Sequence, residues 1–290
     1  MPFVTASVLP FILGSLIAKG DFNMRRFLLG LIAVAATHLS ANLLNDYADS
    51  KSGVDWKDKR FFGFFGGSKL IQEKVFPENF YRNTAVVFSA IASLSVASLA
   101  LIMKNASIVG YFVCILLFAW SYSAKPLQFS YRRLGEIVIF LLFGPAVVMG
   151  AYFIQTALFP DRQSFFLSLP AGFLVTAILF SNEVPDFLED KEAGKFTWVS
   201  FLGPQKAYWV YYGLIAGAFL SIVLNFVYGY LTYCSLIAFI FAMLAIKAGG
   251  ILKKHCFDKT RLIESSKLTI ALHTLVCIVI IADLLICRKS

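Results

Sequence analysis

Residues 134–157 read LGEIVIFLLFGPAVVMGAYFIQTA, and Glu136 is the only charged side chain in this stretch. The hydrocarbon core of a bilayer is about 30 Å thick and takes roughly 20 apolar residues of helix. Backbone groups in lipid must be paired within the protein, so only helices and closed barrels span a membrane. Because the apolar run is unbroken and not alternating, it predicts a transmembrane helix.

Eight further apolar runs accompany this one. The chain has 290 residues, of which 59% are hydrophobic and 15% charged, whereas about a quarter of a soluble domain is charged. We therefore predict an all-α, polytopic membrane bundle of about nine transmembrane helices, forming a single transmembrane domain over residues 1–290. Because Pro10 interrupts the first run and nothing basic precedes it, we interpret that run as a short first span and not as a signal peptide. The other runs cover residues 3–18, 27–44, 83–103, 106–123, 164–181, 207–227, 229–251 and 266–287.

The net charge of +9 arises from Lys and Arg residues whose distribution indicates the membrane topology. The loops after the second, fourth, sixth and eighth runs, together with the adjoining ends of the eighth and ninth runs, hold 19 of the 26 Lys and Arg residues, and 7 lie elsewhere. This bias is the positive-inside pattern, which places those loops and the N-terminus in the cytoplasm and the C-terminus outside. We therefore expect a multi-pass protein of the cytoplasmic membrane that has the lipid bilayer, and no nucleic acid, as its partner; nothing predicts an obligate protein partner.

The acidic residues are concentrated in two places. The loop after the second run holds six of the 17, and the loop after the sixth run holds five. The first group begins inside an apolar run, since His38, Asn42, Asn45 and Asp49 follow at steps of three or four and share one helix face. Charges inside a membrane helix cost about 2.5–3.5 kcal/mol on insertion scales, so they are functional candidates by default. For an isolated pair, a position in water just past the helix end is an equally good interpretation.

The second acidic group repeats the spacing of the first. Asn45-x3-Asp49-x3-Gly53 aligns with Asp186-x3-Asp190-x3-Gly194, each at the cytoplasmic end of a span and four spans apart. Four spans restore the same orientation, so the pattern indicates a parallel repeat. We expect two pseudo-repeated halves whose carboxylates face each other across a central cavity.

Converging carboxylates require cations. At about 4 Å, two like charges repel by roughly 4 kcal/mol at an effective dielectric constant of 20. Mg²⁺ favours carboxylate and phosphate oxygens, so paired Asp sets together with a diphosphate would complete its shell.

Other residues that often carry chemistry give weaker signals. The five cysteines show no paired spacing, so we expect neither disulfides nor a zinc site. We interpret His38 as a hydrogen-bonding residue of the bundle interior and His273 as a packing residue.

Four segments resemble the UbiA superfamily of membrane prenyltransferases, and within it the branch that prenylates 1,4-dihydroxy-2-naphthoate in menaquinone synthesis. They are NLLNDYADSKSGVD (42–55), YSAKPLQFSYRRLGE (122–136), GPAVVMGAYFIQT (144–156) and NEVPDFLEDKEAGK (182–195). The G-G-S run at 66–68 fits the same branch. Gly53 stands where the commoner superfamily motif repeats its last Asp, while Lys125 and Gln128 depart from the residues usual in the branch.

The resemblance implies roles for individual residues. It places the catalytic, Mg²⁺-binding carboxylates at Asp46, Asp49, Asp186 and Asp190. It places substrate-binding residues at Asn42, Asn45, Asp55, Lys69, Tyr122, Arg132, Tyr152, Asn182 and Lys195, where Tyr122 and Tyr152 are candidates for stabilising an allylic cation through their ring faces.

The implied reaction is Mg²⁺-assisted transfer of a polyprenyl group from a prenyl diphosphate to an aromatic acceptor, with 1,4-dihydroxy-2-naphthoate favoured. A sister activity on 4-hydroxybenzoate, homogentisate or a glycerol phosphate lipid is the alternative. A secondary transporter is the rival from another class, because transporters also combine repeats with intramembrane polar residues. Two features argue against it: the acids lie at one face of the membrane, and no pair of spans is interrupted near its centre.

Overall fold

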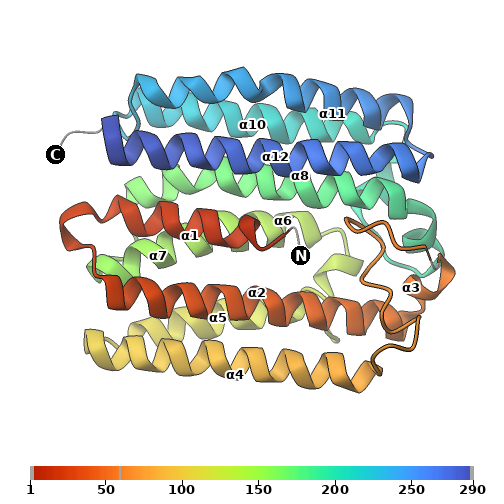
Figure 1. The fold of residues 1–290 in the computed structure, drawn as a ribbon, viewed down its shortest axis with the longest axis horizontal. Helices are drawn as coiled ribbons and strands as arrows, with labels where there is room; N and C mark the ends of the chain where they lie inside the picture. The colour runs from red at the N-terminus through yellow and green to blue at the C-terminus, as the bar shows by residue number, and fades with distance from the viewer. Residues whose placement is uncertain (1–2, 59, 288–290) are drawn as a thin grey trace.

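The computed structural model describes residues 3–58 and 60–287, which form a bundle of helices lying along one common direction (Figure 1). The helices are α1 (Thr5–Ile17), α2 (Met24–Ser52), α3 (Val54–Lys57), α4 (Glu78–Met103), α5 (Ser107–Ser121), α6 (Gly135–Leu141), α7 (Val147–Thr156), α8 (Arg162–Glu192), α9 (Trp198–Leu202), α10 (Ala207–Val227), α11 (Ala242–Lys254) and α12 (Lys259–Ala282). Wider or tighter helical turns extend three of the spans: η3 (Leu142–Ala146) joins α6 to α7, η4 (Tyr233–Phe241) leads into α11, and η5 (Asp283–Cys287) follows α12.

The all-helical membrane bundle predicted from the sequence is confirmed. Within the described residues, seven helical segments are long and apolar enough to cross a membrane. Two shorter apolar helices, α1 and α5, lie where the other two runs are predicted. With 13 residues, α1 is only about 20 Å long at 1.5 Å per residue, which agrees with a short first span.

The predicted ends of two runs are wrong. α2 continues eight residues beyond residue 44, to Ser52, and α8 continues eleven residues beyond residue 181, to Glu192. The first acidic group therefore begins on α2, as expected, and all five residues of the second group lie on α8 and not in a loop. Charged side chains ended the apolar runs in the sequence, but the backbone stays helical, with Asp49 and Asp190 buried in the bundle and Lys51 and Lys191 exposed.

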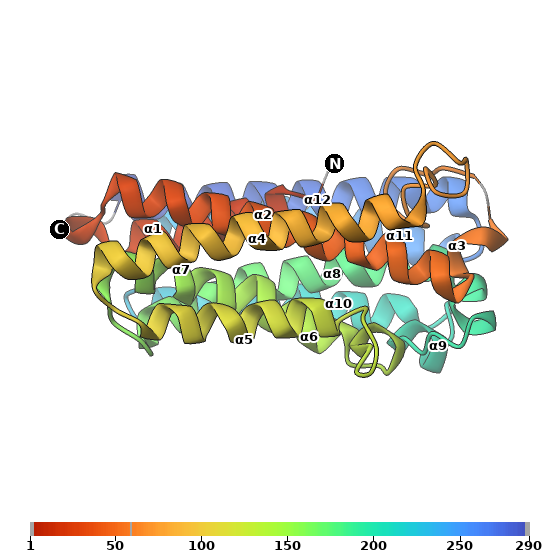
Figure 2. The same ribbon diagram turned by 90° about the horizontal axis from the view of Figure 1, so that it is seen from below.

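The helices form two groups with a layer between them (Figures 1 and 2). α2, α4 and α5 lie on one side, and α8, α10, α11 and α12 lie on the other, with α1 and α6–η3–α7 between the groups. α4 packs along α2, and α10 packs along α8 in the same way. The two long helices that carry the acidic residues thus occupy equivalent places in the two halves.

The middle layer approaches α8 closely where both backbones carry glycine. A Cβ atom at Gly144 of η3 would lie 2.8 Å from the Gly172 Cα atom of α8, which is too short for any side chain. Pro145 lies in the same wider turn and has no N–H to give to a regular helix. This turn packs against α8, and its residues form one wall of the site described below.

One expectation about cysteine is wrong. Cys234, in η4, is disulfide-bonded, while Cys114, Cys256 and Cys277 have free thiols. Close spacing in the sequence was the only available signal for pairing, and the cysteine nearest to Cys234 along the chain, Cys256, has a free thiol.

Candidate active site

A cavity of about 750 Å³ lies between the two halves of the bundle. Its walls come from α1, α2, α4, α5, the α6–η3–α7 span and α8, together with the loop from residue 58 to residue 73. The carboxylates gather at one end, and mostly apolar side chains line the rest, with Ser7, Thr37 and His38 among them. We call this space the chamber and its carboxylate-lined end the mouth.

The first acidic group lies on one face of α2. Asn42, Asn45, Asp46 and Asp49 all line the chamber, as the steps of three and four predict. The Asn45 amide donates a hydrogen bond of 3.1 Å to Asp49 Oδ2 and accepts one of 2.9 Å from the Ser123 hydroxyl. Asn45 therefore holds the Asp49 carboxylate in place and ties it to the loop after α5.

Gly53 ends α2 and turns the chain towards α3. Its φ of +86° lies in the left-handed region, which glycine adopts without steric cost. The turn brings Asp55, on α3, back to the chamber, where its carboxylate forms an ion pair of 3.3 Å with Lys69. Burial and then the charge of Asp49 raise the pKa of Asp55 to about 7, although Lys69 opposes the shift.

Two glycines let the loop at 58–77 pass over the mouth. Gly66 and Gly67 have φ values of +75° and +74°. A Cβ atom at Gly67 would lie 2.5 Å from Asp55 Oδ2, so no larger residue fits there without moving that carboxylate. The G-G-S run of the sequence thus has a steric reason.

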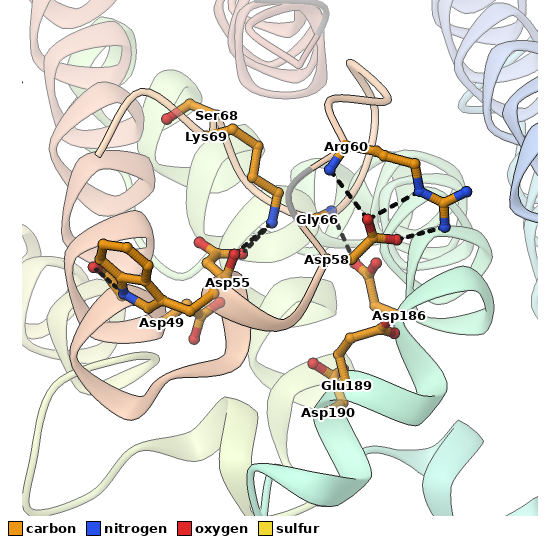
Figure 3. Close-up of polar contacts among 12 residues, drawn as sticks. Asp49, Asp55, Asp58, Arg60, Gly66, Ser68, Lys69, Asp186, Glu189 and Asp190 are labelled. Atoms are coloured by element: carbon orange, nitrogen blue, oxygen red, sulfur yellow. Dashed lines mark hydrogen bonds and ion pairs between the residues drawn. The ribbon is translucent and has the colours of Figure 1, made fainter. Parts of the chain in front are cut away.

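The same loop is tied to both long helices. The Gly66 N–H donates a hydrogen bond of 3.0 Å to Asp186 Oδ2 on α8 (Figure 3). Ser68 is hydrogen-bonded to Asp46 on α2. At the start of α12, Lys259 Nζ contacts Asp58 Oδ2 at 3.0 Å and Glu189 Oε1 at 2.7 Å. The loop therefore lies across the space between the two acidic helices and is anchored at each side.

The second acidic group lines the opposite wall. Asn182, Asp186, Glu189 and Asp190 of α8 face the chamber, and Figure 3 shows Asp186 and Asp190 across the mouth from Asp49 and Asp55. Asn182 accepts a hydrogen bond of 2.7 Å from the Ser266 hydroxyl on α12. The two motifs that the sequence aligns as a repeat are therefore on facing walls of one cavity.

Lys195 bridges the two motifs. Its Nζ atom lies 3.2 Å from Asp49 Oδ2 and 3.6 Å from Asp190 Oδ1. Burial alone would lower the pKa of this ammonium group, but the Asp190 and Asp49 carboxylates raise its pKa well above the usual value. Lys195 is thus a fixed positive charge at the mouth.

Three polar residues of this region were missed by the sequence reasoning. The Tyr131 hydroxyl donates a hydrogen bond of 2.6 Å to Asp49 Oδ1. Glu183 lines the chamber within hydrogen-bonding reach of the buried Glu136 carboxyl, and Glu136 accepts a hydrogen bond of 2.8 Å from the Trp198 N–H. All three residues lie inside the segments that resemble the family. The sequence therefore indicated the right segments but not which of their side chains reach the site.

The structure does not bring Arg132 and Tyr152 to the site. Arg132 is exposed and donates to the Pro126 carbonyl at 2.8 Å. Tyr152 packs against the core formed by α8, α10 and α12 and does not line the chamber. Their positions in the resembling segments gave no information on which way the side chains point. Tyr122, by contrast, lines the chamber.

The histidines take the positions expected of them. His38 is buried, and its Nδ1 atom lies 2.8 Å from the Ser7 hydroxyl of α1. His273 is fully buried in α12.

The mouth has the oxygen donors that Mg²⁺ prefers, but they do not form a closed cage. Among the described residues, no three His, Cys, Asp or Glu side chains converge to hold an ion by themselves. Mg²⁺ is usually held by one or two carboxylates together with waters and substrate phosphates. The donor set therefore fits a metal that arrives with, or is completed by, a phosphorylated ligand.

Comparison with known proteins agrees with this architecture. The family model described as "UbiA prenyltransferase family" matches residues 7–263. A UbiA prenyltransferase domain-containing protein 1 of Dictyostelium discoideum is 30% identical over 221 residues, which cover 75% of this chain and 66% of that protein. A 1,4-dihydroxy-2-naphthoate octaprenyltransferase of Mycobacterium tuberculosis is 30% identical over 223 residues, which cover 77% of this chain and 73% of that protein.

Solved structures share the fold. The apo structure of a UbiA homologue from Aeropyrum pernix superposes with a TM-score of 0.77 at 18% identity, covering 97% of this chain and 98% of the other. A UbiA homologue from Archaeoglobus fulgidus, bound to DMAPP and Mg²⁺, superposes with a TM-score of 0.60 at 17% identity over 95% of this chain and 96% of the other. With its helical bundle, its facing acidic motifs and a match over most of its length, the chain belongs to the UbiA prenyltransferase family.

Proposed function

We propose that this protein transfers a prenyl group from a prenyl diphosphate to an aromatic acceptor, 1,4-dihydroxy-2-naphthoate, inside the membrane. One observation carries the proposal: carboxylates from α2 and α8 meet at the polar mouth of a chamber that is otherwise mostly apolar. An isoprenoid diphosphate has the same division into an anionic head and an apolar tail. The mouth thus matches the anionic head of this donor, and the rest of the chamber matches its apolar tail.

The diphosphate would be held at the mouth. Asp46 and Asp49 on α2, and Asp186 and Asp190 on α8, are the residues that would hold Mg²⁺. The bound metal would neutralise charge on the diphosphate as it leaves. Lys195 and Lys69 add fixed positive charge, and both are held in place by ion pairs with carboxylates.

The loop at 58–77 would shield the reacting carbon from water. Its anchors to Asp186, Asp46 and Asp55 hold it over the mouth. Exclusion of water strengthens the electrostatic contacts and prevents hydrolysis of a reactive intermediate. Tyr122, which lines the chamber, could offer its ring face to positive charge that develops on the allylic carbon.

The choice of acceptor rests on relatives. Proteins of Mycobacterium tuberculosis and Bacillus subtilis that are 30% and 27% identical to this chain are named 1,4-dihydroxy-2-naphthoate octaprenyltransferases. A product of this kind would place the chain in menaquinone synthesis. Other aromatic acceptors or a glycerol phosphate lipid are the alternatives, and a digeranylgeranylglyceryl phosphate synthase structure shares the fold with a TM-score of 0.65.

We further propose that the mouth faces the cytoplasm, where a soluble acceptor would arrive. The surplus of Lys and Arg lies in the loops at the end of the bundle that holds the mouth. The disulfide-bonded Cys234 lies at the opposite end, after α10. Disulfides persist in oxidising compartments outside the cytoplasm, so both signals give the same orientation.

The test is prenyl transfer by the purified protein in detergent or liposomes. Radiolabelled geranylgeranyl diphosphate is supplied with 1,4-dihydroxy-2-naphthoate, 4-hydroxybenzoate, homogentisate or geranylgeranylglyceryl phosphate, with Mg²⁺ or with excess EDTA. We expect a labelled naphthoquinol product only when Mg²⁺ is present. Preferential labelling of another acceptor would contradict the acceptor assignment, and full turnover in EDTA would contradict the proposed role of the carboxylates.

A further inference from the structure

At the end opposite the mouth, packed side chains narrow the chamber against the backbone of α2. Its lining on α2 reaches from Asp49 to Gly30, where Phe11 of α1 and Ile154 of α7 converge. A Cβ atom at Gly30 would lie 2.3 Å from Ile154 Cδ1 and 2.7 Å from the Phe11 Cζ atom. The ends of two large side chains therefore already fill the space over the Gly30 backbone. We call Phe11, Gly30 and Ile154 the floor.

Contacts behind the floor make it firm. The Phe11 ring packs on Phe27, with 5.5 Å between the ring centroids. Beyond it, the Asn23 N–H donates a hydrogen bond of 2.7 Å to Gln155 Oε1, and Arg26 Nη1 donates one of 2.7 Å to the Gln155 carbonyl. These bonds pin the start of α2 to the end of α7, and none of the four residues behind the floor lines the chamber.

The distance from the mouth to the floor limits the length of the tail. Asn42 lies one turn deeper than Asp46, and the twelve residues from Asn42 to Gly30 rise by about 18 Å along the helix. One extended isoprene unit adds four carbon–carbon bonds, or about 5 Å. The enclosed part of the chamber therefore has the depth of about four isoprene units.

We propose that the floor makes this protein selective for donors of about four isoprene units. The inference rests on the proposed function, since it assumes that the diphosphate binds at the mouth and the tail points inward. The walls between mouth and floor are mostly apolar, including Val34, Leu99, Phe112, Val147 and Ala151, with Ser7, Thr37 and His38 as the polar side chains among them. A longer tail would have to fold back or leave the chamber sideways, and either would weaken binding.

Two substitutions move the limit in opposite directions. Val34 lines the chamber one turn above Gly30, so Val34→Phe would shorten the available path by about one isoprene unit. Ile154→Ala removes one of the two side chains over Gly30 and would deepen the path. Ile32 on the same helix is 46% exposed and faces away from the chamber, so Ile32→Phe and Ile32→Ala are the matched controls.

The experiment measures dissociation constants of the full-length protein for all-trans prenyl diphosphates of two, four and eight units, in Mg²⁺ and without acceptor. For the unsubstituted protein and both Ile32 controls, we expect the eight-unit donor to bind at least about tenfold more weakly than the four-unit donor. Val34→Phe should weaken four-unit binding at least about tenfold and leave two-unit binding within about twofold. Ile154→Ala should strengthen eight-unit binding severalfold.

The proposal would be overturned if the dissociation constants were equal for all donor lengths and were not changed by Val34→Phe or Ile154→Ala. That result would show that the tail leaves through the side of the bundle. Because transfer is not the readout, the two proposals can fail separately. A length limit without transfer to any acceptor would leave the floor in place and contradict the proposed function. Absence of binding for every donor would contradict both.

Discussion

Lys195 forms an ion pair with Asp49 across the mouth of the chamber, with 3.2 Å between Nζ and Oδ2, although 146 residues separate the two in sequence. The same ammonium group lies 3.6 Å from Asp190 Oδ1. Lys195 therefore joins the acidic motif of α2 to that of α8. It neutralises part of the repulsion between them and leaves a positive charge where the diphosphate is expected.

Replacing Lys195 by Met should weaken donor binding more than it weakens the fold. Met keeps most of the side-chain length but removes the charge, and a hydrogen bond to a charged group contributes about 1.5–3 kcal/mol. We expect the dissociation constant for geranylgeranyl diphosphate to rise about 10- to 100-fold in Mg²⁺. Lys195→Arg, which keeps the charge, should retain a large part of the affinity for the donor. Equal losses of affinity in the two variants would show that the charge of Lys195 does not contribute to donor binding.

Gly67→Ala should disturb the loop over the mouth. The new Cβ atom would meet Asp55 Oδ2 at 2.5 Å, in addition to the strain of a φ of +74°. Left-handed backbone costs an L-residue about 1–2 kcal/mol. Gly229 is the matched control, because it has a φ of +70° and nothing within 4 Å of its Cβ position. We expect both variants to lower the melting temperature, but only Gly67→Ala to reduce turnover; unchanged turnover would show that the Asp55–Lys69 pair adapts freely.

Arg132→Ala should leave turnover within about threefold of the unsubstituted protein. Its guanidinium group is exposed, and within the described residues its side chain donates a hydrogen bond to the Pro126 carbonyl alone. Substitutions at such surface positions change the free energy of unfolding by about 0.5 kcal/mol or less. Steady-state kinetics with varied donor and acceptor would check this. A large rise in KM for the acceptor would show that Arg132 reaches the substrate after all.

Cysteines placed at the two ends of the bundle test the orientation. Ser52 lies at the end of α2 beside the mouth, and Leu158 follows α7 at the opposite end and is 59% exposed. In intact cells, an impermeant thiol reagent should label Leu158→Cys, while Ser52→Cys should react only after permeabilisation. The unsubstituted protein gives the background from Cys114, whose thiol is free and exposed. Labelling of Ser52→Cys from outside would reverse the topology.

Much of the fold follows from the sequence because lipid imposes a simple rule. Long unbroken apolar runs can only be helices in a membrane, so the predicted runs agree with the helices of the bundle. The ends of α2 and α8 were misplaced because hydropathy falls where charged side chains begin, whereas the helical backbone continues past that point. Asp49 and Asp190 lie on such continuations.

The site was less predictable residue by residue. Spacing along a helix is enough to place Asn42, Asn45, Asp46 and Asp49 on one face, and the structure shows them together in the chamber. Side chains in irregular segments have no such period. Tyr131, which donates to Asp49, and Arg132, which points away, are neighbours in one turn, and only the folded chain distinguishes them.

The most direct test of the central claim is a double-mutant cycle on turnover with Asp49→Ala and Asp190→Ala. If the carboxylates of α2 and α8 act on one metal-bound diphosphate, either loss leaves it poorly stabilised. Each single variant should then lose at least about a hundredfold in turnover, comparable to the loss of one preorganised electrostatic contact. The double variant should be little worse than either, because residues that act as a unit are non-additive. Near-normal turnover of Asp190→Ala, or losses that simply multiply in the double variant, would contradict a shared site.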